Sequence, residues 1–238
     1  MTETESEHTI APDGYAPWSG HVPDHGRRTP VTTYRLQMGA ALTFDDARRL
    51  VPYLHDLGIT DVYLSPVLAA APGSTHGYDV VDHTRISEVM GGRAGLERLA
   101  DDVHAAGMGL VLDIVPNHMA VPTPAWHNLP LWSVLRDGPD SPYASWFDVS
   151  VEAPILMPVL GARIGKVLAD EQLVLDRMTV PTEPERGEQW VLRYFDHVFP
   201  VAEGTQSLPM HVLVDRQHYR LAYWKVGDEE INYRRFFD

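Results

Sequence analysis

The sequence predicts an α/β protein whose strands run parallel. Three apolar runs alternate with two segments of helical periodicity, in the order strand, helix, strand, helix, strand. Parallel strands need long crossover connections, which helices usually supply with a right-handed path. After the third run, about 120 residues pass without another such unit, which is too long for a bare loop. We therefore expect a subdomain inserted after the third strand.

The same pattern predicts three regions along the chain. Residues 1–31 are rich in Pro, Gly, Ser, Asp and His, a composition typical of a flexible N-terminal tail. Residues 32–119 hold the three strands and their helices. Residues 120–238 form the expected inserted subdomain.

The first strand is expected at residues 32–38, "TTYRLQM". The first helix is expected to begin at Thr43, because Asp46 three residues later completes a capping-box pattern. Apolar residues then recur at helical spacing as far as Leu57, and Gly58 is a typical residue after a helix C-terminus.

Two further strands flank the second helix. The strands are expected at residues 60–67 and 109–115, and the helix at residues 92–108. The three strand segments look apolar on both faces, as the strands of a buried parallel sheet do.

The elements of the inserted region are less regular. We expect a short helix at residues 131–137, a hairpin over residues 166–176 that turns near Ala169 and Asp170, and one strand at residues 189–201.

Composition excludes several classes of protein. The formal net charge of −14 over 238 residues argues against nucleic acid or an anionic membrane as a partner. The chain has no cysteine, so disulfides and thiolate metal sites are excluded. The sequence contains no signal-peptide pattern and no run long enough to span a membrane, so we expect a cytoplasmic location.

A polar cluster follows the third strand. Asp113, Asn117 and His118 lie where the apolar run ends, and Pro116 fixes the direction in which the chain leaves. Ligands of parallel α/β proteins bind at the carboxyl ends of the strands. Each residue taken alone is more often structural, but the cluster as a whole predicts a ligand site.

A second polar cluster lies between the second strand and the second helix, in "GSTHGYDVVDH". Its chemistry-bearing residues are His76, Tyr78, Asp79, Asp82 and His83. Tyr78 offers a flat ring and a hydroxyl, which suits packing against a sugar. The alternative is an ordinary polar surface loop. The spacing fits no specific metal motif, so we expect neither a metal nor a cofactor.

Two motifs in these clusters resemble those of a known family. "DIVPNH", residues 113–118, resembles the first conserved motif of the α-amylase superfamily of retaining glycosidases and transglycosylases. "HGYDVVDH", residues 76–83, resembles the His-Gly-Tyr-x-x-x-Asp segment of that superfamily. From about residue 32 to the C-terminus, further segments such as "TTYRLQM" and "SPYASWFDV" resemble the branch of the superfamily that forms trehalosyl ends.

The resemblance implies a (β/α)8 TIM barrel. Residues 32–119 would supply strands 1–3 of the barrel, and residues 120–238 would form an inserted subdomain that leads back toward it. The implied substrate is a maltooligosaccharide or another α-1,4-glucan. The implied reaction is an intramolecular transfer that turns the α-1,4 bond at the reducing end into an α,α-1,1 bond.

The resemblance also assigns six substrate-binding residues: His76, Tyr78, Asp82, Asp113, Asn117 and His118. Tyr78 would stack on the glucose at the reaction centre, with Asp82 nearby to orient it. Asp113 would support the site from within the barrel, and His118 would hydrogen-bond the same sugar. Asn117 would brace the loop, although its counterpart binds calcium in many amylases.

The catalytic carboxyl groups are expected elsewhere. Retaining glycosidases use two carboxyl groups about 5 Å apart, and the superfamily carries them after the fourth and fifth barrel strands. No segment of this chain matches them: Asp215 lies in an apparent helix, and Glu229 and Glu230 are adjacent residues. We therefore expect the nucleophile and the acid/base beyond Asp238, and the isolated chain to be an inactive fragment.

Two alternatives stay open. One is an α-amylase-type glucan hydrolase, because exclusion of water from the completed site decides between transfer and hydrolysis. The other is a non-catalytic or degenerate glucan-binding protein that uses Tyr78 and His118 for affinity.

Overall fold

The computed structural model describes residues 29–149 and 153–227. Contacts divide the chain into Met1–Pro30 and Val31–Asp238. The tail predicted for residues 1–31 lies almost wholly outside the described residues, as do Glu229 and Glu230.

A three-stranded parallel sheet forms the first half of the described chain. Its strands are β1 (Thr33–Leu36), β2 (Asp61–Leu64) and β5 (Gly109–Leu112), in the order β1-β2-β5. Arg35 lies opposite Tyr63, and Tyr63 lies opposite Val111. The predicted parallel arrangement is confirmed, with each strand shorter than expected.

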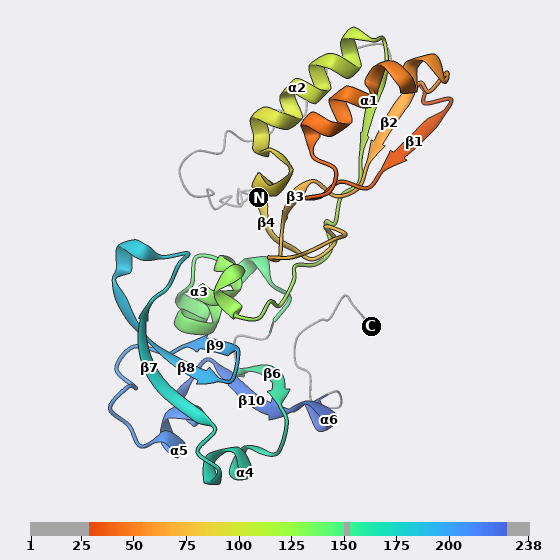
Figure 1. The fold of residues 1–238 in the computed structure, drawn as a ribbon. Helices are drawn as coiled ribbons and strands as arrows, with labels where there is room; N and C mark the ends of the chain where they lie inside the picture. Colours follow the sequence, from red (N-terminus) through yellow and green to blue (C-terminus); the bar gives the residue numbers. More distant parts are fainter. Residues whose placement is uncertain (1–28, 150–152, 228–238) are drawn as a thin grey trace, which may run out of the picture. The chain divides into compact units, whose positions relative to one another are not determined.

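Two helices cover one face of this sheet (Figure 1). They are α1 (Phe44–Asp56) and α2 (Gly92–Ala105). The predicted capping box is confirmed, because the Thr43 side chain accepts from the backbone N–H of Asp46 while the Asp46 carboxylate accepts from the backbone N–H of Thr43. The core between helices and sheet consists of apolar side chains, with Phe44, Leu64, Leu99 and Val103 fully buried.

The opposite face of the sheet differs from the prediction. The strand segments looked apolar on both sides, but Arg35 is exposed and Tyr63 is half-buried. Side chains alternate between the faces of a strand, so these two residues lie on the face away from Leu36, Val62 and Leu64, which are buried. That face is polar where the strands end.

The segment between β2 and α2 contains a hairpin where the sequence predicted a polar loop. Strand β3 (Leu68–Ala70) pairs antiparallel with β4 (Val80–Ile86) through an irregular register. Asp82 and His83 therefore belong to a strand. A polar strand of this kind lacks the apolar alternation by which strands are identified in a sequence.

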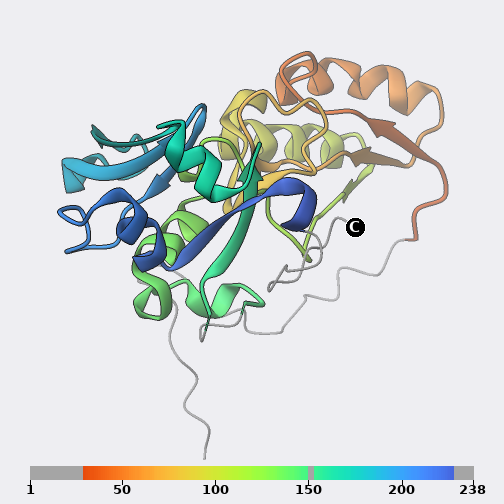
Figure 2. The same ribbon diagram turned by 90° about the horizontal axis from the view of Figure 1, so that it is seen from below.

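The second half of the described chain builds two further sheets (Figures 1 and 2). Strand β6 (Ile155–Leu160) pairs parallel with β10 (Tyr219–Tyr223). Strands β7 (Leu173–Thr179), β8 (Glu188–Tyr194) and β9 (His197–Pro200) form an antiparallel sheet in chain order. Their inner faces enclose a core of their own.

Short helices complete this half. The α-helices are α3 (Leu129–Asp137), α4 (Ile164–Ala169), α5 (Met210–Leu213) and α6 (Trp224–Gly227). The 3-10 helices of the described chain are Glu88–Met90, Ala125–His127, Gly138–Asp140, Ala144–Trp146, Pro184–Arg186 and Val214–Arg216.

Two predictions for this half were wrong. The hairpin expected over residues 166–176 is the helix α4 followed by β7, since residues up to Ala169 are helical. The single strand expected at residues 189–201 is a pair, β8 and β9, joined by a turn at Phe195. Phe195 has φ of 51°, a left-handed conformation that no glycine signals in the sequence.

A buried ion pair ties α3 to the loop before β8. Arg136 and Glu183 have side chains that are 10% and 7% exposed, and their nearest N and O atoms are 2.5 Å apart. The indole of Trp132 donates to the same Glu183 oxygen at 3.0 Å. A buried pair of this kind fixes the position of α3 relative to that loop. Loss of one partner would leave the other charge buried without compensation.

None of the helices in the described ranges combines the length and the apolar character needed to cross a membrane.

The capping box gives a prediction about stability. Thr43→Ala removes the side-chain acceptor at the start of α1 and should lower the free energy of unfolding by about 1 kcal/mol. Thr75→Ala is the matched control, because Thr75 is exposed and its hydroxyl makes no hydrogen bond to a described residue; it should change stability by less than about 0.5 kcal/mol. Denaturant unfolding measures both, and equal losses would contradict the role of the cap.

Candidate active site

The candidate site is built around Asp113, at the end of β5. The backbone N–H of Asp113 donates to the carbonyl of Leu64 at 3.0 Å, which continues the parallel ladder one residue past the strand. The alternation of side chains then places the carboxylate on the polar face of the sheet. There the Tyr63 hydroxyl donates to Asp113 Oδ2 at 3.0 Å.

The loop over residues 71–79 brings a second tyrosine to the same oxygen. Gly77 has φ of 79°, and a Cβ at this position would lie 2.7 Å from the Pro66 carbonyl oxygen, so the close approach requires glycine. The Ser74 hydroxyl accepts from the Gly77 N–H at 3.0 Å and holds the turn. Tyr78 follows directly, and its hydroxyl donates to Asp113 Oδ2 at 2.5 Å.

Two residues at the end of β1 hold the tyrosine and its loop. Arg35 Nη2 donates to the Tyr78 hydroxyl at 3.2 Å, and Arg35 Nη1 donates to Gln37 Oε1 at 2.9 Å. Gln37 Nε2 lies 3.4 Å from the carbonyls of Thr75 and His76. The ends of β1, β2 and β5 and the loop over residues 71–79 therefore lie together around the Asp113 carboxylate.

His118 closes the cluster from the segment after β5. Its Nε2 lies 3.2 Å from the backbone carbonyl oxygen of Tyr78, and its Nδ1 lies 3.1 Å from Asn117 Oδ1. A neutral imidazole donates from one nitrogen, so the ring satisfies one of these oxygens, or both when it is protonated. Asn117 contacts His118, and its bracing role stays a prediction.

His76 shapes the loop through its ring. Its Nδ1 accepts from the backbone N–H of Tyr78 at 3.0 Å, and its ring stacks on that of Tyr78 with centroids 6.1 Å apart. The Asp79 carboxylate lies 3.7 Å from the same nitrogen. That distance is too long for a hydrogen bond, so the backbone N–H of Tyr78 is the group that orients the ring.

Asp82 and His83 face other partners. The Asp82 carboxylate accepts from the backbone N–H and hydroxyl of Thr84 and pairs with Arg85 at 3.0 Å. His83 Nε2 lies 2.7 Å from the Val115 carbonyl oxygen, where it supports the segment that leads to His118. Within the described chain, Asp82 has no hydrogen bond to Tyr78 or Asp113, and its substrate role stays a prediction.

The charges around Tyr78 keep its hydroxyl group protonated. Its hydrogen bond to the Asp113 carboxylate raises the pKa of Tyr78, and the weaker influence of Arg35 opposes this. The hydrogen bond to Tyr78 in turn raises the pKa of Arg35. Tyr78 is 37% exposed, so its ring is accessible to a ligand while its hydroxyl is engaged.

The sequence did not identify Arg35, Gln37 or Tyr63 as site residues. A signal was present, because Arg35 is a charged residue three positions before the end of the first predicted strand, "TTYRLQM". In a parallel sheet, a charged residue near the end of a strand lies at the carboxyl edge of the sheet, where ligands bind.

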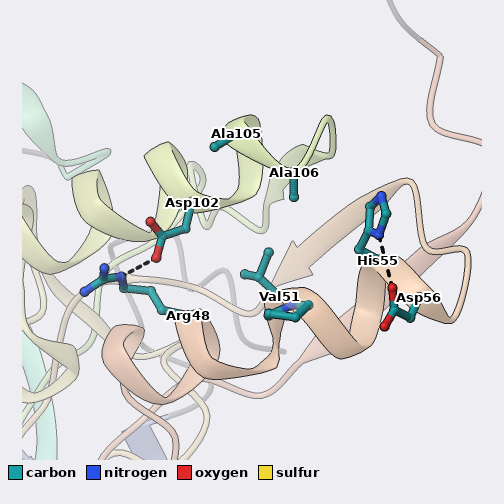
Figure 3. A pocket seen from close by; sticks show the side chains of 8 residues that line it. Arg48, Val51, His55, Asp56, Asp102, Ala105 and Ala106 are labelled. Carbon is teal, nitrogen blue, oxygen red and sulfur yellow. Dashed lines mark hydrogen bonds and ion pairs between the residues drawn. The ribbon is translucent and has the colours of Figure 1, made fainter.

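A groove of about 380 Å³ lies between α1 and α2 (Figure 3). Arg48, Val51, His55 and Asp102 are among the residues that line it, and Arg48 donates to Asp102 at 2.7 Å. These residues come from the helices, and none of the predicted substrate-binding residues lines the groove. We therefore assign the candidate site to the Asp113 cluster. Within residues 29–149 and 153–227, no group of three or more His, Asp or Glu residues is placed to hold a metal ion.

Comparison with known families agrees with this geometry. The model of the alpha amylase catalytic domain matches residues 48–211. The chain belongs to the alpha-amylase family. The matched range includes Tyr63, Tyr78, Asp113 and His118.

Similar proteins add detail. A putative maltooligosyl trehalose synthase of Mycobacterium tuberculosis is 41% identical over 217 residues, which is 87% of this chain and 26% of that protein. An intracellular maltogenic amylase of Bacillus subtilis is 34% identical over 97 residues, 41% of this chain and 15% of that protein. The resemblance to the trehalose-forming branch is confirmed.

Solved structures show the same similarity. The maltooligosyltrehalose synthase of Arthrobacter ramosus has 43% identity and a TM-score of 0.76, over 87% of this chain and 26% of that one. Another maltooligosyl trehalose synthase has 37% identity and a TM-score of 0.75, over 88% and 27%. The chain therefore spans about a quarter of the length of these relatives.

The tyrosine–carboxylate contact gives a prediction about titration. Asp113→Asn removes the charge that holds the pKa of Tyr78 above its ordinary value, so that pKa should fall toward about 10. The ultraviolet absorbance of the phenolate, compared with a Tyr78→Phe reference, measures it. Asp82→Asn is the control and should leave the titration of Tyr78 in place; an unchanged pKa in Asp113→Asn would contradict the contact.

Proposed function

We propose that this chain contributes one wall of the substrate site in an enzyme that acts on α-1,4-glucans by intramolecular transglycosylation. The reaction is that of a maltooligosyl trehalose synthase, in which the reducing-end glucose is relinked through an α,α-1,1 bond. The observation that carries the proposal is the cluster in which Arg35, Tyr63, Tyr78 and His118 converge on or beside Asp113. The similarity to such synthases over 87% of the chain supports it.

The proposed architecture follows from the same comparison. Strands β1, β2 and β5 are the first three strands of a (β/α)8 barrel, and the elements from α3 to α6 belong to a subdomain inserted after the third. The parallel order β1-β2-β5 and the two helices on one face support this arrangement. In such barrels ligands bind at the carboxyl ends of the strands, which is where Asp113 lies.

The cluster suits binding rather than bond cleavage. The exposed ring of Tyr78 can stack on a pyranose, as aromatic rings do with apolar sugar faces. His118 and Asn117 offer hydrogen-bonding groups at its edge, and His76 sets the ring orientation from behind. Asp113 Oδ2 is engaged by two hydroxyls, so we assign it a supporting role.

The bond-breaking groups of the proposed reaction come from other segments. Retaining transfer needs a nucleophile and an acid/base about 5 Å apart. In the described part of the chain, Asp79 is hydrogen-bonded to Ser74, and Asp82 contacts Thr84 and Arg85, so we assign neither carboxylate to that pair. The chain supplies the positions that hold the sugar.

A hydrolase of the same family is the second candidate. The Bacillus subtilis maltogenic amylase favours it, but that similarity covers 41% of the chain against 87% for the synthases. The two candidates give different products from the same substrate.

Products from maltopentaose test the proposal. The natural gene product that carries this chain should convert maltopentaose mainly into a non-reducing product with a trehalosyl end. Tyr78→Ala should lower kcat/KM by about 10- to 100-fold, as should His118→Ala, because each removes a contact worth about 1–3 kcal/mol. Separation of non-reducing products from glucose and shorter maltosaccharides provides the measurement.

Matched controls come from residues outside the site. Tyr53→Ala and His104→Ala change an exposed tyrosine of α1 and an exposed histidine of α2 and should leave kinetics unchanged. Glucose and shorter chains as sole products would assign the protein to the hydrolases. Binding of maltopentaose without turnover would assign it to glucan-binding proteins.

The 238-residue chain by itself should be inactive. Binding groups alone do not replace a nucleophile and a general acid, so incubation with maltopentaose should yield neither trehalosyl products nor shorter maltosaccharides. Circular dichroism confirms that the assayed material is folded. Turnover by folded material would show that a carboxyl group of this chain performs the chemistry.

A further inference from the structure

Within the described chain, Arg35 at the end of β1 contacts Gln37, Tyr63 and Tyr78, all residues of the candidate site. Its Nη2 donates to the Tyr78 hydroxyl at 3.2 Å, and its Nη1 donates to Gln37 Oε1 at 2.9 Å. Its guanidinium carbon lies 5.6 Å from the centroid of the Tyr63 ring. One planar group therefore touches both tyrosines that donate to Asp113.

These contacts fix the direction of the protons in the cluster. A guanidinium has donors and no acceptor, so the Tyr78 oxygen accepts from Arg35. The Tyr78 proton is then directed to Asp113 Oδ2, 2.5 Å away, and Tyr63 donates to the same oxygen at 3.0 Å. Asp113 Oδ2 therefore accepts hydrogen bonds from both tyrosine hydroxyls, and Asp113 acts as an acceptor in this arrangement.

We propose that Arg35 is a positioning residue of the active site, which fixes the plane and the hydroxyl orientation of Tyr78 against the sugar. The catalytic meaning of this assignment rests on the proposed function. Arg35 itself acts through Tyr78, since its contacts in the described chain are with side chains of the protein. Tyr63 is the second brace, because it holds Asp113 from the neighbouring strand.

The geometry requires arginine rather than a positive charge alone. The two terminal nitrogens reach Tyr78 and Gln37 at once, while the flat guanidinium faces the Tyr63 ring. A lysine ammonium is a point charge on a flexible stem and lacks this planar fork. Arg35→Lys therefore keeps the charge and loses the simultaneous hold on Tyr78 and Gln37.

The test uses the natural gene product with Arg35→Lys, Arg35→Gln and Arg35→Ala. Each should lower kcat/KM for maltopentaose by about 10-fold or more, with the larger part in kcat, because a misplaced ring weakens the transition state more than ground-state binding. Guanidinium ion added to Arg35→Ala should restore part of kcat, whereas ammonium ion should not. Arg98→Gln on α2 is the matched control, since Arg98 pairs with Asp45 outside the site.

A second readout separates positioning from general loss of structure. The hydrogen bond from Arg35 opposes the rise that Asp113 causes in the pKa of Tyr78. Arg35→Gln should therefore raise that pKa further, the opposite of the shift expected for Asp113→Asn. Phenolate absorbance against a Tyr78→Phe reference measures both shifts, and damage to the fold would not produce opposite signs.

The kinetics and the titration together decide the proposal. Loss of kcat together with a raised pKa of Tyr78 supports it. A raised pKa with unchanged kinetics, or no change in either, overturns it. A wild-type protein that does not convert maltopentaose overturns the proposed function instead, and the titration together with calorimetric binding of maltopentaose to Arg35→Gln then decides whether Arg35 positions Tyr78 for a bound glucan.

Discussion

The backbone hydrogen bond from Asp113 to Leu64 is the constraint on which the candidate site depends. It is the last rung of the parallel ladder between β2 and β5, with N and O 3.0 Å apart. Parallel registration places Arg35, Tyr63 and Val111 side by side, and Asp113 follows two residues after Val111 on the same face. The three strand ends therefore present their polar groups to one point.

The same register separates the site from the core. Phe44 and Leu54 of α1 and Leu99 of α2 bury the opposite face of the sheet. Gly95 allows α2 to approach, because a Cβ there would lie 3.1 Å from the Phe44 ring. A slip of one residue in any strand would exchange the two faces, so the packing that stabilises the fold also specifies which side chains reach the candidate site.

Local patterns predicted the parts of this arrangement that are local. The strand–helix alternation, the cap at Thr43 and the polar clusters around Tyr78 and His118 each follow from a few neighbouring residues. Arg35 and Tyr63 were missed because their proximity depends on the register between strands 28 residues apart in sequence, as the pairing Arg35–Tyr63 shows. No single strand contains that information.

Other errors have similar physical origins. Strand β4 is polar at Asp82, His83, Thr84 and Arg85, so the alternation that marks a strand is absent. Helix α4 has six residues, too few to display helical periodicity against the strand that follows. For β4, pairing with β3 rather than local preference selects the conformation.

The cluster implies a division of labour within the proposed active site. Asp113 accepts hydrogen bonds from two phenols, and such an oxygen is a poorer nucleophile than one free to approach an anomeric carbon. The raised pKa of Tyr78 keeps its hydroxyl protonated, so the residue offers a neutral ring and not a base. Under the proposed function, this wall of the site binds the sugar and does not attack it. Whether the sugar is transferred or hydrolysed depends on the groups that complete the site, because they supply the carboxyl pair and determine how well water is excluded.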